Sequence, residues 1–390
     1  MAPKVETGLG RLSSLDVDVV RLVRGRRVGL LAQPASVDSS LRHAELVLPA
    51  AGARLCALFG PEHGYTGQAQ DMKSVVGAAA DAIPVRSMYG ETFEDLSPRP
   101  EWLAGLDAVV IDLQDVGSRY YTFVWSAALM LQACARAGVE CIVLDRPNPL
   151  GGLVMEGLPQ RSGYRSFVGL YDVPVRHALT IGEILRMVCE LETVASSALH
   201  VVPMLGYRRS MLFPDTGLPW VLPSPNMPTF ETALVYPGGC LIEGTNLSEG
   251  RGTTRPFELW GAPFVDGARL ARDIQFQGAS LRPATFEPTF HKHRQATCGG
   301  VQLHVSDAQQ FRSFAAYLRM LAWVANDAEA FRFRVEPYEY VSDRPAIDLL
   351  TGGTEFRKAL TARQPTDELV SWLAEVPLDF AERRESWLLY

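Results

Sequence analysis

A glutamate and a histidine stand next to each other in a turn that glycine and proline restrain. The chain reads Leu-Phe-Gly-Pro-Glu-His-Gly-Tyr-Thr-Gly from Leu58 to Gly67, and this turn presents Glu62 and His63. Glycine and proline hold a backbone in shapes that few other residues adopt, so one carboxyl and one imidazole are offered at fixed positions. These groups transfer protons in catalysis. For an isolated segment, an ordinary loop that faces water would be the favoured interpretation, but similar loops elsewhere change it.

Short, nearly continuous apolar runs occur at residues 27–33, 54–59, 108–113 and 140–144. Such runs are typical of parallel strands that are buried on both faces of a sheet. Between the last two runs, a segment rich in helix formers ends at Gly138, which stands in the position of a C-terminal cap. Strand, helix and strand follow one another as a βαβ unit, so the sequence predicts an α/β fold.

A polar and restrained loop follows each predicted strand. Ligands of open α/β sheets bind outside the carboxyl ends of the strands, so these loops together describe a site better than any one of them. Besides Glu62 and His63, their candidate residues are Asp115, Arg119, Tyr120, Tyr121, Asp145, Arg146 and Asn148. Each keeps a structural alternative: Asp115 caps a turn, Arg119 pairs with it, and the tyrosines belong to the core.

The second half of the chain differs from the first in its proline content and in its pattern of apolar residues. Residues 211–228 contain five prolines, more than a helix or central strand tolerates, and predict a long crossing segment. A strand is expected at residues 233–236. Farther on, helices at 266–276 and 309–326 and a strand at 301–305 predict smaller α+β units.

A glycine-rich loop after residue 236 forms a second polar cluster. Its charged and amide side chains alternate with glycines and include Glu243, Asn246, Glu249 and Arg251. This composition suits hydrogen bonding to a polyhydroxylated or anionic ligand. A surface loop whose charges satisfy one another is the alternative.

The composition argues against two classes of partner. The chain has 390 residues, a formal net charge of −7 and no run of Lys and Arg, which disfavours nucleic acid and anionic membranes. No apolar stretch approaches the length of a membrane span, and the start of the chain has no apolar signal core. We therefore expect a globular, cytoplasmic protein that is long enough for two domains.

A nicotinamide-dependent oxidoreductase would also suit the predicted sheet. However, no Gly-x-Gly-x-x-Gly follows an early strand, and the Pro-Ala-Ser after Gln33 does not let a pyrophosphate approach in the usual way. His291 and His293 would share one face of a strand, but no third metal ligand is visible nearby. We expect neither a cofactor nor a metal.

Five motifs carry a resemblance to a known family. They are, in order, Phe-Gly-Pro-Glu-His-Gly, Leu-Gln-Asp-Val-Gly-Ser-Arg-Tyr-Tyr-Thr, Leu-Asp-Arg-Pro-Asn-Pro-Leu-Gly-Gly, Pro-Ser-Pro-Asn-Met-Pro-Thr and Glu-Gly-Thr-Asn-Leu-Ser-Glu-Gly-Arg-Gly-Thr-Thr-Arg-Pro-Phe-Glu. Over nearly its whole length, the chain resembles the NamZ family of exo-acting β-N-acetylmuramidases. The resemblance implies a glycoside hydrolase that releases N-acetylmuramic acid from the non-reducing ends of peptidoglycan fragments in cell-wall turnover. It also implies a Rossmann-like catalytic domain at 1–230 and a smaller α+β domain at 231–390, with the active site in the cleft between them.

Glycoside cleavage needs an acid that protonates the leaving oxygen and a group opposite that receives the oxocarbenium-like carbon. The place of Glu62 at a strand end and its match to the family motif make it the expected acid. His63 would orient Glu62 or act as a second proton carrier. Asp115 and Glu243 are the candidates for a second carboxylate, unless the acetamido group of the substrate takes that part.

The remaining motif residues are expected to bind the substrate: Tyr120, Tyr121, Asp145, Arg146, Asn148, Asn226, Asn246 and Glu249. N-acetylmuramic acid carries a lactyl carboxylate, which the planar fork of an arginine fits, and Arg119 and Arg251 are the candidates. A non-catalytic protein that binds wall sugars is the alternative function, because binding and catalysis use the same cleft.

Overall fold

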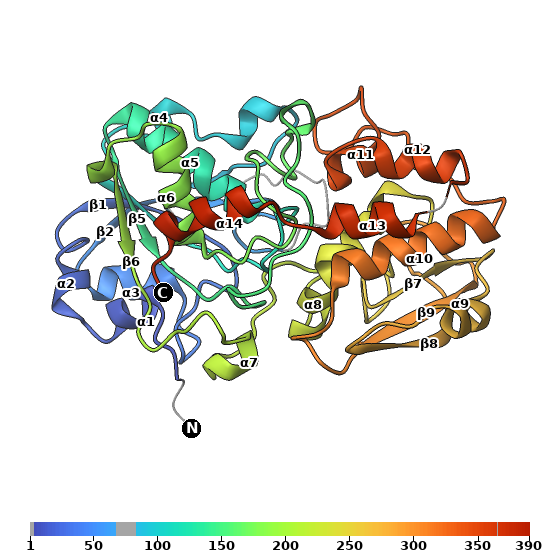
Figure 1. Cartoon of the computed structure of the whole chain (residues 1–390). Helices are drawn as coiled ribbons and strands as arrows, with labels where there is room; N and C mark the ends of the chain where they lie inside the picture. The colour runs from blue at the N-terminus through green and yellow to red at the C-terminus, as the bar shows by residue number, and fades with distance from the viewer. Residues whose placement is uncertain (1–3, 68–82, 365) are drawn as a thin grey trace.

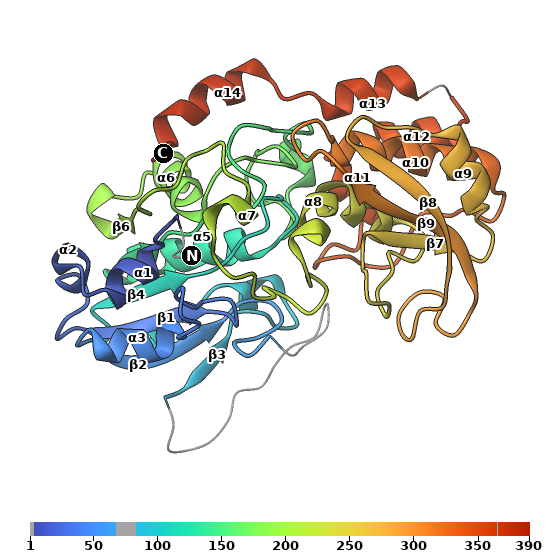
Figure 2. The same ribbon diagram turned by 90° about the horizontal axis from the view of Figure 1, so that it is seen from below.

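A parallel sheet and a smaller antiparallel sheet lie side by side, each with its own helices (Figures 1 and 2). The computed structural model describes residues 4–67, 83–364 and 366–390. We call residues 4–67 and 83–228 the parallel-sheet unit and residues 229–374 the antiparallel-sheet unit. This architecture confirms the predicted α/β class with a second, smaller α+β part.

The six strands of the parallel-sheet unit follow the order β3-β2-β1-β4-β5-β6, and all neighbours are parallel. Their bounds are β1 Arg27–Ala32, β2 Arg54–Gly60, β3 Val85–Ser87, β4 Ala108–Asp112, β5 Glu140–Leu144 and β6 Leu199–Val202. The four apolar runs of the sequence coincide with β1, β2, β4 and β5. The edge strands β3 and β6 are short and mostly half-buried, so they carry no such run.

Helices cover both faces of the parallel sheet, because successive strand residues point to opposite sides. In β4, Ala108 and Val110 pack into the core that includes α1 to α3, whereas Val109 and Ile111 pack into the core that includes α5 and α6. The helices of this unit are α1 Gly8–Ser13, α2 Val17–Val20, α3 Ala44–Ala50, α4 Pro100–Leu103, α5 Phe123–Ala137, α6 Ile181–Leu191 and α7 Phe213–Thr216. The predicted helix and its cap are confirmed, since Gly138 follows α5 with a φ of 66°.

The antiparallel-sheet unit has three strands in the order β7-β9-β8, with bounds β7 Leu259–Ala262, β8 Ala279–Phe286 and β9 Cys298–Val305. Its helices are α8 Phe230–Gly239, α9 Gly267–Asp273, α10 Ser313–Asp327, α11 Ala346–Thr351, α12 Glu355–Thr361 and α13 Asp367–Ala374. Helix α8 packs against α10 beside the sheet. The predicted helices near 266–276 and 309–326 and the strand near 301–305 are confirmed as α9, α10 and β9.

The strand expected at residues 233–236 is wrong, because these residues lie inside helix α8. Thr229 is the N-cap residue of the helix, and its side-chain oxygen accepts a hydrogen bond from the Thr232 amide. Every residue of α8 from Thr232 to Gly239 is buried. A short apolar run that is buried on all sides has no periodicity that distinguishes a strand from a helix.

The C-terminal segment, residues 375–390, returns to the parallel-sheet unit. Helix α14 (Leu378–Arg384) lies near α6 in both views (Figures 1 and 2). Beyond it, the indole nitrogen of Trp387 donates to Glu190 at 2.9 Å, and the hydroxyl of Tyr390 donates to Asp145 at 2.9 Å. The boundary between residues 230 and 231 stays a prediction, and the last residues of the chain pack away from the second unit.

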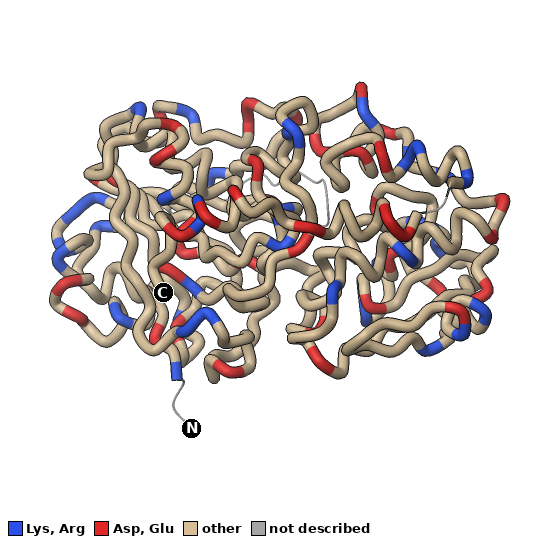
Figure 3. The backbone as a smooth tube through the Cα atoms, in the orientation of Figure 1, with Lys and Arg blue, Asp and Glu red and all other residues tan. Residues whose placement is uncertain are grey.

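Charged residues of both signs are interspersed over both units (Figure 3). Among the residues that Figure 3 colours, basic residues do not gather along one element as they do in a nucleic-acid-binding face. Among the described residues, no helix has the length and apolar character that crossing a bilayer requires.

Candidate active site

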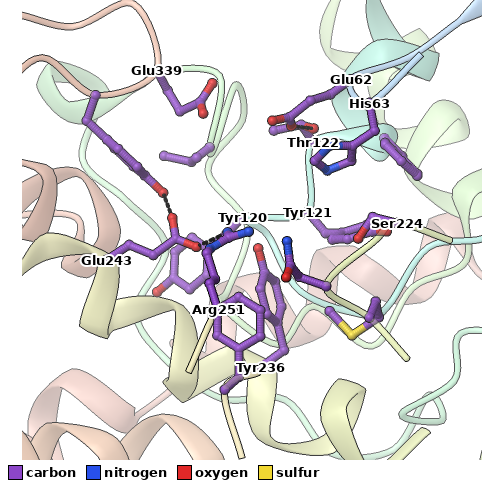
Figure 4. A pocket seen from close by; sticks show the side chains of 16 residues that line it. Glu62, His63, Tyr120, Tyr121, Thr122, Ser224, Tyr236, Glu243, Arg251 and Glu339 are labelled. Carbon is purple, nitrogen blue, oxygen red and sulfur yellow. Dashed lines mark hydrogen bonds and ion pairs between the residues drawn. The ribbon is translucent and has the colours of Figure 1, made fainter. Parts of the chain in front are cut away.

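A cavity lies where the two units meet, and side chains of both line it (Figure 4). It encloses about 450 Å³ of empty space, part of which is open to solvent. The parallel-sheet unit contributes Glu62, His63, Tyr120, Tyr121, Thr122, Phe123, Val168, Ser224, Asn226 and Met227. The antiparallel-sheet unit contributes Tyr236, Glu243, Arg251, Phe257, Tyr338 and Glu339.

Glu62 lies in the tight turn after β2, at the wall of the cavity. A Cβ atom at Gly60 would lie 2.3 Å from the amide nitrogen of Tyr65, so glycine is required for the chain to fold back here. The Thr122 hydroxyl donates a 2.7 Å hydrogen bond to Oε2 of Glu62, whose residue is 6% exposed. This hydrogen bond fixes the position of the carboxyl group at the wall of the cavity.

His63 follows in the same turn and has left-handed backbone geometry, with a φ of 68°. Its ring lies edge-on to Phe123, with 6.3 Å between the ring centroids, and the residue is buried. Figure 4 shows His63 beside Glu62 on the same wall. The turn therefore presents both predicted side chains to one cavity.

Glu243 and Arg251 form the opposite wall. Nη2 of Arg251 lies 2.6 Å from Oε1 of Glu243, and the Tyr338 hydroxyl donates to Oε2 of Glu243 at 2.7 Å. The Arg251 guanidinium stacks near the Phe257 ring, 5.3 Å from its centroid. The glycine-rich loop thus delivers a cation and an anion to the site.

Glu249 lies behind Arg251 and is fully buried. Its carboxylate pairs with Nε of Arg251 at 3.1 Å, with Nζ of Lys292 at 3.1 Å and with Nδ1 of His291 at 3.0 Å. Burial opposes ionisation, but the charge of Lys292, the hydrogen bond with His291 and the charge of Arg251 outweigh it and hold the pKa of Glu249 well below its ordinary value. Glu249 therefore positions Arg251 from behind and does not line the cavity.

Asp115 and Arg119 lie outside the lining of the cavity. One oxygen of Asp115 accepts from the Gly117 amide at 2.8 Å and lies 3.3 Å from Nε2 of His177. The fully buried guanidinium of Arg119 donates to the backbone carbonyls of three other segments: Leu158, Val173 and Leu350. Burial lowers the pKa of Arg119. In this structure, Arg119 ties the loop after β4 to helix α11.

The candidates after β5 are also engaged in the interior of the parallel-sheet unit. Asp145 accepts hydrogen bonds from the Thr180 hydroxyl at 2.8 Å and from the Gly182 amide at 3.0 Å, at the start of α6. Burial raises the pKa of Asp145 to about 7. The Arg146 guanidinium pairs with Asp112 at the end of β4.

Asn148 and Asn246 organise the backbone around them. The Asn148 amide donates to the carbonyl of Leu179 at 3.0 Å. The Asn246 amide donates to the carbonyl of Ala330 at 2.9 Å, and its side-chain oxygen accepts from the Arg332 amide at 2.9 Å. Both asparagines hold neighbouring segments in place, and neither lines the cavity.

His291 and His293 contact different partners. His291 pairs with Glu249, whereas Nε2 of His293 lies 2.7 Å from the carbonyl oxygen of Asn246. Within the described part of the chain, no group of three or more His, Cys, Asp and Glu side chains is arranged to hold a metal ion. That the site works without a metal stays a prediction.

The structure thus brings seven of the candidates into one cavity: Glu62, His63, Tyr120, Tyr121, Asn226, Glu243 and Arg251. The sequence interpretation missed Thr122, Ser224, Tyr236, Tyr338 and Glu339. Thr122 and Ser224 belong to motifs that were recognised, so their neighbours could have indicated them. Tyr338 and Glu339 lie in a turn directly after Pro337, but this turn has no polar motif that was recognised. They share a cavity with Glu62 only through tertiary packing.

Family models match both halves of the chain: exo-beta-N-acetylmuramidase NamZ, N-terminal, over residues 28–231, and exo-beta-N-acetylmuramidase NamZ, C-terminal, over residues 234–390. This chain belongs to the NamZ family. A relative from Bacillus subtilis (strain 168), described as peptidoglycan beta-N-acetylmuramidase NamZ, is 39% identical over 395 aligned residues. The alignment covers 100% of this chain and 92% of the relative.

Two solved structures from Bacteroides fragilis share the fold of this NamZ-family chain. Both are described as DUF1343 family proteins. The first has a TM-score of 0.84 and 30% identity and covers 100% of both chains. The second has a TM-score of 0.75 and 26% identity and covers 99% of both chains. The two-unit architecture is therefore shared over the whole length.

Proposed function

We propose that this NamZ-family chain is an exo-acting β-N-acetylmuramidase that releases N-acetylmuramic acid from the non-reducing ends of peptidoglycan fragments. Its membership of the family and the described activity of the Bacillus subtilis relative support this function. The observation that carries the proposal is a buried glutamate, Glu62, in a cavity that both units line. A glycoside hydrolase needs a carboxyl group in such a place.

Glu62 acts as the general acid in this proposal. Its proton passes to the glycosidic oxygen, and the bond between that oxygen and the anomeric carbon breaks. The electron pair stays on the oxygen, so the remaining fragment leaves as an alcohol. Water then bonds to the anomeric carbon through its oxygen and loses one proton, which replaces the proton that Glu62 gave up. The Thr122 hydrogen bond keeps the carboxyl group of Glu62 in place during proton transfer, and His63 in the same turn supports it.

Release of nitrophenol from a 4-nitrophenyl β-N-acetylmuramide tests this function. We expect turnover of this activated substrate by the wild type. On an unactivated muramide with an alcohol leaving group, Glu62→Gln should lose about 10²- to 10⁴-fold in rate, because the amide keeps the shape but gives up no proton. The matched control is Glu101→Gln, which changes an exposed glutamate of α4. A wild type that binds the muramide without cleaving it would instead be a wall-sugar-binding protein. Equal rates for wild type and Glu62→Gln on both the activated and the unactivated muramide would remove Glu62 from the acid role.

Independence from metal is a separate prediction. The cavity lining contains one histidine and no ligand set of recognisable spacing. Dialysis against a strong chelator should leave the rate of muramide cleavage unchanged. Loss of the rate on dialysis, with recovery on adding a divalent ion, would contradict both the metal-free site and the acid role of Glu62.

A further inference from the structure

The cavity contains a carboxylate opposite Glu62 that the sequence did not indicate. A glycoside hydrolase needs, besides its acid, a group that receives the positive charge at the anomeric carbon. Of the two carboxylates expected for this part, Asp115 lies outside the cavity lining. The choice within the described lining is therefore between Glu243 and Glu339.

Glu243 is poorly suited to attack or to accept a proton. Its Oε1 pairs with the Arg251 guanidinium at 2.6 Å, and its Oε2 accepts the Tyr338 hydroxyl at 2.7 Å. A charge-assisted hydrogen bond of this length withdraws negative charge from the carboxylate. Glu243 instead fixes the place of Arg251.

Glu339 faces Glu62 across the cavity. Figure 4 shows the two carboxylates on opposite walls, pointing toward each other. Glu339 is 4% exposed, and the Tyr89 hydroxyl donates to its Oε2 at 3.3 Å. Burial raises the pKa of Tyr89 far above its ordinary value, and the negative charges of Glu339 and Glu62 raise it further. Tyr89 therefore stays protonated and donates its hydrogen bond to Glu339.

The backbone at Glu339 is held in an uncommon conformation. Glu339 and the following Tyr340 have φ values of 45° and 66°, in the left-handed region that non-glycine residues rarely adopt. The Tyr340 hydroxyl donates to the carbonyl of Gly90 at 3.0 Å, and its ring contacts those of Tyr89 and Phe167. Such conformations persist where the surroundings fix them, and they cluster at functional sites. Contacts with the parallel-sheet unit thus hold Glu339 toward Glu62.

We propose that Glu339 is the second catalytic carboxylate of the muramidase proposed above, on which this inference rests. As Glu62 protonates the leaving oxygen, the Glu339 carboxylate faces the anomeric carbon and stabilises its positive charge. The water oxygen then bonds to that carbon in one of two balanced ways. Its proton passes to Glu339 directly, or Glu339 first forms an ester whose hydrolysis returns the proton to Glu62.

The test compares Glu339→Ala and Glu339→Gln with Glu336→Gln, a change to an exposed glutamate of the same segment. On the 4-nitrophenyl muramide, both Glu339 variants should lose about 10²- to 10⁴-fold in rate, and the control should retain it. Sodium azide should restore part of the rate of Glu339→Ala and yield the α-glycosyl azide, because the small anion enters the space of the lost carboxylate. A merely structural role gives no such product.

Wild-type activity separates this inference from the function on which it rests. An inactive wild type overturns both. An active wild type with an equally active Glu339→Ala or Glu339→Gln overturns only the role of Glu339. An inactive Glu339→Ala that gives no azide product also overturns that role. If Glu339→Ala fails to fold, full activity of Glu339→Gln decides against the proposal and a loss in that variant supports it.

Discussion

Arg251 is the only arginine or lysine among the described residues that line the cavity. N-acetylmuramic acid differs from N-acetylglucosamine by a lactyl ether that ends in a carboxylate. An arginine binds a carboxylate through two parallel hydrogen bonds, which adds geometric selectivity. Arg119 is the other candidate from the sequence, but its guanidinium donates hydrogen bonds to backbone carbonyls. We therefore assign recognition of the lactyl group to Arg251 as a proposal.

Arg251→Ala should lower kcat/KM on the muramide about tenfold to a hundredfold, because an ionic hydrogen bond contributes about 1.5 to 3 kcal/mol. Its weak activity on the glucosaminide should stay near that of the wild type. Arg255→Ala is the matched control, since Arg255 is an exposed arginine of the same loop. Equal losses on both substrates would show that Arg251 supports the fold of the site and does not read the lactyl group.

At the scale of residues, the sequence predicted what depends on local chemistry. Glu62 and His63 could be found because Gly60 and Pro61 reveal a restrained turn next to them. Glu339, which the other unit contributes, could not be found in this way. It shares a cavity with Glu62 only after both units have folded and packed together. Arg119 has the residue type of a ligand-binding group, but its full burial follows from packing that the sequence does not show.

At the scale of elements, the ion pairs of Glu249 stabilise the folded glycine-rich loop. Replacing Glu249 with Gln leaves Lys292 without its buried counter-ion and removes one of the two carboxylates that pair with Arg251. Removing one partner of a buried pair costs about 3 to 5 kcal/mol. Because the pKa of Glu249 is lowered in the folded protein, its stabilising effect is present above the ordinary value of 4.5 and is lost as the pH falls through the folded value. The free energies of unfolding of wild type and Glu249→Gln should therefore differ at pH 7 and converge in acid.

Urea unfolding at a series of pH values measures this difference. Glu329→Gln, which changes an exposed glutamate of the same unit, should follow the wild type throughout. A gap between wild type and Glu249→Gln that stays constant from pH 7 to pH 3 would contradict the assigned ionisation of Glu249.

The elements themselves were predictable where burial gives a pattern. Strands β1, β4 and β5 are buried on both faces over most of their length, as is the second half of β2, so their sequences are nearly continuous apolar runs. Helix α8 is buried in the same way, and its apolar residues gave the same pattern as a strand. The Thr229 cap and the packing of α8 against α10 distinguish the helix from a strand, and the second of these depends on residues far along the chain.

At the scale of the whole molecule, the C-terminal segment fastens the chain onto the parallel-sheet unit. Trp387 is 2% exposed, packs against Phe380 and donates to Glu190. Trp387→Ala should lower the free energy of unfolding by about 3 to 5 kcal/mol, the usual cost of removing a large buried aromatic side chain. Trp372→Ala is the control, because Trp372 is 40% exposed. Equal midpoints of thermal unfolding for the two variants would show that the segment contributes little to stability.

The return of the chain also limits how the two units can move. The backbone passes between them before α8 and again between α13 and α14. The hydrogen bonds from Arg119 and Tyr120 to the carbonyl of Leu350 link the units at a further place. Because the walls that carry Glu62 and Glu339 belong to different units, any movement of one unit against the other would change the width of the cavity and the separation of these two carboxyl groups.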